Sequence, residues 1–101
     1  MSQSPSGPTA DRVAIDPAAR ATPDSADGRV LMHLETGRMS AINAMGSRIW
    51  SELDAGRSLH EIIDLLAAEY AAPREVIEAD VRAFVAQLAV KRYVRAPGER
   101  R

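Results

Sequence analysis

Two histidines are the nitrogen ligands that this chain could offer to a zinc ion, and the chain contains no cysteine. His33 and His60 lie far apart in the sequence, with no second histidine at the short spacing that zinc sites use. We therefore expect no metal ion.

Ser58 and Glu61 are the closest match to a catalytic pair. Their Ser-x-x-Glu spacing is that of a helix capping box, and no base accompanies the hydroxyl to activate it. The sequence also lacks a phosphate-binding glycine loop and a cluster of carboxylates. It therefore predicts a protein that is not an enzyme and binds no cofactor.

Composition indicates which partners to expect. The 101 residues carry a net charge of -1, which offers no broad attraction for nucleic acid or for an anionic membrane, so neither is expected as a partner. Residues 1–10 have neither the basic start nor the apolar run of a signal peptide, and no stretch approaches the roughly 20 apolar residues of a membrane span. With no cysteine to oxidise, the chain is predicted to be cytoplasmic.

The same composition indicates one small domain. Residues 1–10 are rich in Ser, Pro and Gly and are predicted to be a disordered tail, and residues 95–101 a second tail. The domain between them is predicted to span residues 11–94.

Three helices are predicted from apolar residues that recur near every 3.6 positions. They span about 44–54, 59–70 and 73–92. Asn43 precedes the first, Ser58 and Glu61 open the second, and Pro73 stands in the first turn of the third. The third helix has a broad apolar stripe of Ile77, Val81, Phe84, Val85 and Leu88.

Three strands are predicted before these helices, at 12–16, 29–34 and 38–42. The first ends at Pro17 and is followed by a long connection over residues 18–28, and a turn of Glu35-Thr36-Gly37 joins the other two. The predicted fold is α+β, a winged helix-turn-helix with a three-stranded antiparallel sheet followed by three α-helices.

An ordered series of motifs runs through about residues 13–94. Its members are Leu34-Glu35-Thr36-Gly37-Arg38, Ala41-Ile42-Asn43, Gly46, Ile49-Trp50, Leu53, Ser58-Leu59-His60-Glu61-Ile62-Ile63, Glu78-Ala79-Asp80-Val81 and 84–88. In this order they resemble the PqqD-like leader-peptide recognition domains of peptide natural-product biosynthesis, the RiPP recognition elements. The stand-alone length looks most like the leader-binding half of a split lasso-peptide maturation protein.

The resemblance implies a function. In this family an unstructured precursor leader adds itself as a fourth strand to the edge of the third strand, and its side chains enter a groove against the third helix. The implied edge residues are Arg38, Met39, Ser40, Ala41 and Ile42, and the implied groove wall is Glu78, Val81, Arg82 and Val85. Implied partners are the precursor leader peptide and a separate leader peptidase and macrocyclase. The chain itself would be a monomer or an edge-paired dimer.

Structural roles compete with these assignments. Val81 and Val85, like Phe84 and Leu88, could be core residues, and Arg38 and Arg82 could be solvated surface arginines. Met39 could fill the interface between sheet and helices, Ser40 could be an ordinary edge residue, and Trp50 is interpreted as a core anchor.

A winged-helix DNA-binding regulator is the alternative function. Its recognition helix would be the third helix, which opens with Glu75, Glu78 and Asp80. These carboxylates would face phosphates of the same sign, so charge disfavours that function.

Overall fold

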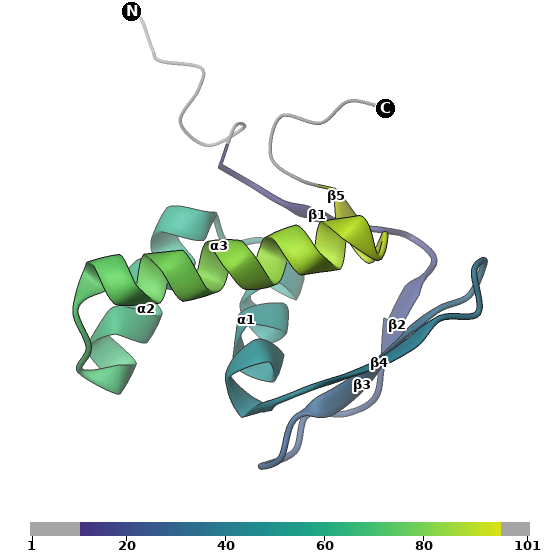
Figure 1. The fold of residues 1–101 in the computed structure, drawn as a ribbon, viewed down its shortest axis with the longest axis horizontal. Helices are drawn as coiled ribbons and strands as arrows, with labels where there is room; N and C mark the ends of the chain where they lie inside the picture. The colour runs from purple at the N-terminus through teal and green to yellow at the C-terminus, as the bar shows by residue number, and fades with distance from the viewer. Residues whose placement is uncertain (1–10, 96–101) are drawn as a thin grey trace, which may run out of the picture.

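A three-stranded antiparallel sheet and three helices form the body of the protein (Figure 1). The computed structural model describes residues 11–95. In chain order its elements are β1 (Ala14–Ile15), β2 (Ala19–Ala21), β3 (Arg29–His33), β4 (Met39–Ile42), α1 (Ala44–Asp54), α2 (Leu59–Tyr70), α3 (Arg74–Val90) and β5 (Val94–Arg95). The sheet has the order β2-β3-β4, and β1 pairs separately with β5. The predicted α+β winged helix-turn-helix is confirmed.

The first predicted strand is wrong in its role. Within 12–16 only Ala14–Ile15 is extended as a strand, and it pairs with β5 at the end of the domain instead of joining the main sheet. The third strand of the sheet is β2, which lies in the predicted connection. Asp16 causes the change of direction, because its carboxylate accepts from the backbone N–H of Ala18 at 2.8 Å and its carbonyl accepts from Ala19 at 2.9 Å.

The helix boundaries follow the predicted caps closely. Asn43 Oδ1 accepts from the backbone N–H of Gly46 at 2.8 Å at the start of α1, and Ser58 and Glu61 form the reciprocal capping box of α2. Helix α3 is shorter than predicted because Pro73 is its N-cap and Arg92, with a φ of 70°, turns the chain into β5. The predicted tail 1–10 and residues 96–101 lie outside the described residues, and Arg95 is in β5.

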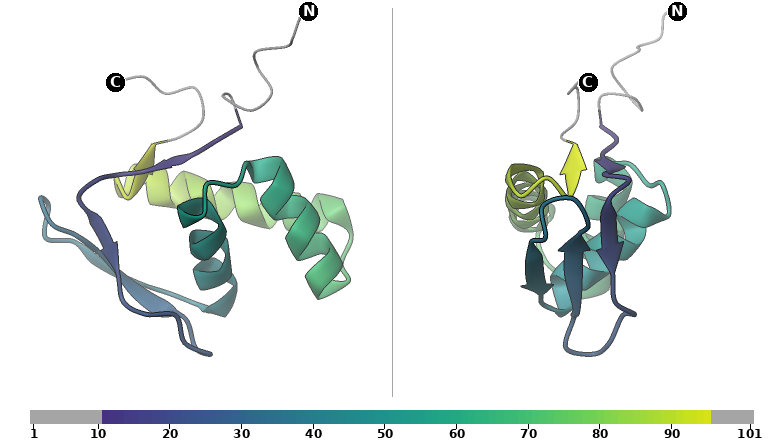
Figure 2. Two further views of the ribbon diagram at one scale, coloured as in Figure 1. Left: turned by 180° about the vertical axis from the view of Figure 1, so that it is seen from behind. Right: turned by 90° about the vertical axis from the view of Figure 1, so that its right-hand side faces the viewer.

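The hydrophobic core lies between the three helices and one face of the sheet (Figure 2). Trp50 is buried on α1, as expected of a core anchor, and Leu31 on β3 is fully buried. Helix α3 contributes one apolar face to this core, consisting of Ile77, Val81, Val85 and Leu88. Because α2 packs along α3 on the same side, Ile77, Val81 and Val85 are not available to a ligand.

A buried histidine fixes the hairpin between β3 and β4. His33 is 1 % exposed, and its Nδ1 atom accepts from the backbone N–H groups of Glu35 and Thr36, each at 3.2 Å. Gly37 completes the turn with a φ of 76°, a conformation that glycine adopts without a Cβ penalty. On its other side the ring of His33 lies 6.2 Å from that of Tyr93, centroid to centroid. The hairpin is therefore held both by its turn and by the core.

Two glycines of positive φ allow a test of the packing at the end of β4. A Cβ at Gly28 would lie 1.9 Å from the Ile42 carbonyl oxygen, whereas one at Gly37 would meet no described heavy atom within 4 Å. We expect Gly37→Ala to lower the free energy of unfolding by about 1–2 kcal/mol through its φ alone. Gly28→Ala should cost about 1–3 kcal/mol more, because backbone must move. Urea unfolding followed by Trp50 fluorescence measures both, and equal losses would contradict the close contact.

Candidate functional site

One edge of β4 is free along its whole length. Within residues 11–95, β4 (Met39–Ile42) pairs with β3 and with no strand on its other side. The backbone N–H of His33 donates to the carbonyl of Arg38 at 2.9 Å, and Ser40 and Ile42 lie opposite Leu31 and Arg29 in the same register. Hydrogen-bonded pairs alternate in an antiparallel ladder, so Ser40 and Ile42 direct their backbone groups toward β3. The N–H and C=O groups of Met39 and Ala41 therefore point outward from the edge.

The side chains of β4 alternate between two environments. Ser40 and Ile42 are half-buried on the face toward the helices, whereas Met39, 66 % exposed, and Ala41 lie on the opposite face. Arg38 is exposed immediately before the strand. The five predicted edge residues are therefore adjacent, and Met39 does not fill the interface between sheet and helices.

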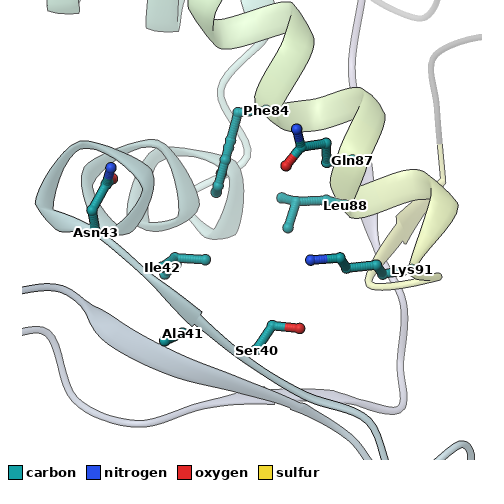
Figure 3. A pocket seen from close by; sticks show the side chains of 8 residues that line it. All are labelled: Ser40, Ala41, Ile42, Asn43, Phe84, Gln87, Leu88 and Lys91. Atoms are coloured by element: carbon teal, nitrogen blue, oxygen red, sulfur yellow. The ribbon is translucent and has the colours of Figure 1, made fainter.

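A groove lies between this strand and the C-terminal half of α3 (Figure 3). Its volume is about 200 Å³, and its lining residues are Ser40, Ala41, Ile42, Asn43, Phe84, Gln87, Leu88 and Lys91. A second hollow of about 330 Å³ lies toward α1 and shares Asn43, Phe84 and Gln87 with it. The free edge of β4 therefore borders a groove that has a second hollow next to it.

The aromatic ring of Phe84 lies between the two hollows, and its position depends on close packing against Gly46. A Cβ at Gly46 on α1 would lie 2.9 Å from Cε1 and from Cζ of Phe84. Since glycine has no Cβ, the Phe84 ring rests directly on the first turn of α1. The depth of the groove thus depends on Gly46.

The residues of the predicted groove wall divide between the core and the surface of α3. Val81 and Val85 are 0 % and 3 % exposed and belong to the core. Glu78 and Arg82 form an ion pair with each other at 3.0 Å and line neither hollow, and Arg82 also lies 3.9 Å from Asp11. The observed wall is the neighbouring face of α3, which consists of Phe84, Gln87, Leu88 and Lys91.

The spacing of these four residues in the sequence indicates that they could form one wall. Positions 84, 87, 88 and 91 are i, i+3, i+4 and i+7 on one helix, so they share a face. The predicted apolar stripe of α3 included Phe84 and Leu88, but the predicted wall of Glu78, Val81, Arg82 and Val85 came from the family resemblance and did not include them. Which side of α3 meets β4 depends on how the sheet packs against it.

Two of the polar residues of the groove, Ser40 and Lys91, lie at one end of it. Ser40 Oγ accepts a hydrogen bond from the buried Tyr93 hydroxyl at 3.0 Å, which leaves the proton of Ser40 available to the groove. In Figure 3 the Lys91 side chain extends from α3 toward β4. Among residues 11–95, no carboxylate lies within the 4.0 Å ion-pair distance of Lys91.

The strongest charge cluster lies elsewhere and joins helices. Hydrogen bonds from Arg48 lower the pKa of the Glu52 carboxyl, and Arg57 also donates to it at 2.5 Å. Arg48 also bonds Glu69 on α2 at 3.0 Å. These contacts hold α1 against α2 on a part of the molecule that the groove does not reach.

Two further observations concern the described residues alone. Within residues 11–95 no three His, Cys, Asp or Glu side chains are grouped so that they could hold a metal ion. No helix in the same range is long and apolar enough to cross a membrane.

Comparison with known families gives one matching model. Residues 28–94 match the family of coenzyme PQQ synthesis protein D (PqqD). The PqqA binding protein of Gluconobacter oxydans (strain 621H) is 54 % identical over 39 residues, which are 39 % of this chain and 41 % of that relative. The aligned stretch thus spans about two fifths of the curated relative.

Solved structures match over nearly the whole domain. TbiB1 in complex with the TbiA(beta) leader peptide is 38 % identical, with a TM-score of 0.78 over 87 % of this chain and 99 % of that one. The PqqD truncation of Methylobacterium extorquens PqqCD, a stand-alone RiPP recognition element, is 26 % identical, with a TM-score of 0.69 over 92 % and 98 % of the chains. A lasso peptide synthetase B1 complexed with its leader peptide, 23 % identical, shares the fold with a TM-score of 0.74 over 82 % and 96 %.

The contact between Gly46 and Phe84 can be tested directly. We expect Gly46→Ala to displace the Phe84 ring and to shift the NMR signals of the Ile42 and Leu88 methyl groups beside it. The helix itself gains up to about 1 kcal/mol from alanine, so the variant should remain folded. Phe84→Leu in the same chain should relieve the displacement, and a double-mutant cycle measures the coupling. Unmoved methyl signals in Gly46→Ala would show that the ring does not rest on α1.

Proposed function

The chain belongs to the PqqD family, and on this basis we propose that it binds the leader segment of a ribosomally synthesised precursor peptide at the free edge of β4. The observation that carries the proposal is the outward-pointing backbone of Met39 and Ala41 beside a groove, in a fold like that of TbiB1, which was solved with a leader peptide. The domain that does this is the predicted range 11–94.

Strand addition accounts for affinity but not for selectivity. Each backbone hydrogen bond contributes only about 0.5–1.5 kcal/mol net, and the leader must be ordered as it binds. The edge offers such bonds to any extended chain, so selectivity must come from side chains. In this protein the groove formed by β4 and α3 supplies them.

The proposed pathway role is presentation without catalysis. The bound leader holds its core peptide for separate enzymes, a leader peptidase and a macrocyclase if the product is a lasso peptide. The proposed compartment is the cytoplasm, where the precursor is translated. Binding along the edge also occupies the backbone groups through which two copies of the chain could otherwise pair.

The DNA-binding alternative finds no support in the described residues. Helix α3, which would have to enter the major groove, packs one face in the core and places Glu75 in its first turn. Residues 74–82 carry Glu75, Glu78 and Asp80 against Arg74 and Arg82, and both arginines are already paired with Glu78. A positively charged reading face is absent from this part of α3.

The β4 edge provides a matched pair of variants. Ala41→Pro removes an outward N–H and leaves the ladder to β3 intact, whereas Ser40→Pro removes an N–H that bonds β3. We expect Ala41→Pro to remain folded and to lose at least about tenfold in leader affinity, since a leader carbonyl is left without its donor. Ser40→Pro should be destabilised itself.

Fluorescence polarisation with synthetic leaders measures the affinities. The probes are leaders from short reading frames beside the gene, together with the TbiA(beta) leader, and circular dichroism verifies the fold. Wild-type binding near micromolar, about 8 kcal/mol, is expected for at least one probe. Unchanged affinity in folded Ala41→Pro would place binding on another surface.

A further inference from the structure

Strand addition at β4 fixes which leader side chains enter the groove. Ser40 and Ile42 direct their backbone groups to β3, so they form non-hydrogen-bonded pairs with an added strand that runs antiparallel to β4. Side chains approach most closely at such pairs. Two leader residues, separated by one intervening residue and by roughly 7 Å, therefore face the groove beside Ser40 and Ile42.

The position beside Ile42 has three apolar neighbours, although Asn43 and Gln87 also line the groove. Ile42, Phe84 and Leu88 line this part of the groove, with the Phe84 ring fixed against Gly46. A large apolar leader side chain suits this position, since it would bury its surface against three hydrocarbon walls.

The position beside Ser40 is different because it offers donors. The Tyr93 hydroxyl donates to Ser40 Oγ at 3.0 Å, so the Ser40 O–H is directed elsewhere. Lys91 is half-buried, lines the same groove and extends toward β4 (Figure 3). A hydroxyl donor and an ammonium group thus border one small space, and a carboxylate could accept from both.

Charge varies in one direction along the groove. On α3, Asp80 lines the far hollow, Gln87 the middle and Lys91 the end near Ser40. Arg38, which is exposed and two residues before Ser40, adds a second positive charge at the start of β4. The end near Ser40 is therefore cationic and the far end is acidic.

We propose that Lys91 and Ser40 form a carboxylate subsite, so that this protein selects leaders with an acidic residue two positions from a large apolar one. The inference rests on the proposed function and adds the chemistry of the leader. The order of the two residues reports strand direction, because Ser40 precedes Ile42 on β4. In the sequence of an antiparallel leader the apolar residue comes before the acidic one. In a parallel leader the acidic residue comes first.

Selection from random peptides tests this preference whatever the sequence of the natural leader. Random 12-residue peptides are displayed and selected on the full wild-type chain, and those that also bind Ala41→Pro are discarded, which retains ligands that need the β4 edge. One enriched peptide and its acid→Lys variant are then titrated against wild type, Lys91→Glu and Arg82→Glu. Arg82 is the control because it is a cation of the same helix outside the groove.

We expect the selected peptides to be enriched in an acidic residue that lies two positions from a large apolar residue. The acid→Lys peptide should bind wild type at least tenfold more weakly, and Lys91→Glu should reverse the preference between the two peptides. Arg82→Glu should keep the wild-type preference. Edge-dependent peptides with no acidic position, or a preference that Lys91→Glu leaves unchanged, would overturn the subsite and leave leader binding intact. If no selected peptide depends on the β4 edge, the proposed function fails and the subsite fails with it.

Discussion

The register between β3 and β4 is the constraint on which the rest of the site depends. A shift by one residue would exchange the two faces of β4, so that Met39 and Ala41 would face the helices and Ser40 and Ile42 would carry the free backbone groups. The turn that prevents this shift is held by the buried His33 ring, which accepts from two backbone N–H groups, and by Gly37 at a φ of 76°. The buried contacts of His33 thus determine which backbone groups of β4 are free.

The same edge is supported from the far end of the chain. The reversal at Arg92, with a φ of 70°, brings Tyr93 into the core, where its hydroxyl donates to Ser40. Asp16, which follows β1, donates its backbone N–H to the Tyr93 carbonyl at 2.8 Å. Residues from both ends of the domain therefore meet behind β4. A protein of this size can hold an open strand rigid only if such distant segments are joined there.

Local signals in the sequence were enough for the helices and for the hairpin. Caps at Asn43 and Ser58 and the turn glycine Gly37 act within a few residues, so their effects can be read directly from the chain. The outer strand Ala19–Ala21 could not be read in this way, because two alanines around one arginine give a weak alternation. The residues that line the groove in the structure could not be read from the sequence for a related reason. Phe84, Gln87 and Lys91 share a face with Leu88, but only the tertiary packing shows that this face meets β4.

An open edge strand favours pairing between copies unless something opposes it. Two copies joined edge to edge about a two-fold axis perpendicular to the sheet would run antiparallel, with both α3 helices on the same face of the joined sheet. The edge has only four residues in β4, so such a pair would gain few backbone bonds. A peptide strand at the same edge can make the same bonds and can also place its own side chains in the groove beside Ile42, Phe84 and Lys91. The groove therefore favours a peptide ligand over a second copy of the chain.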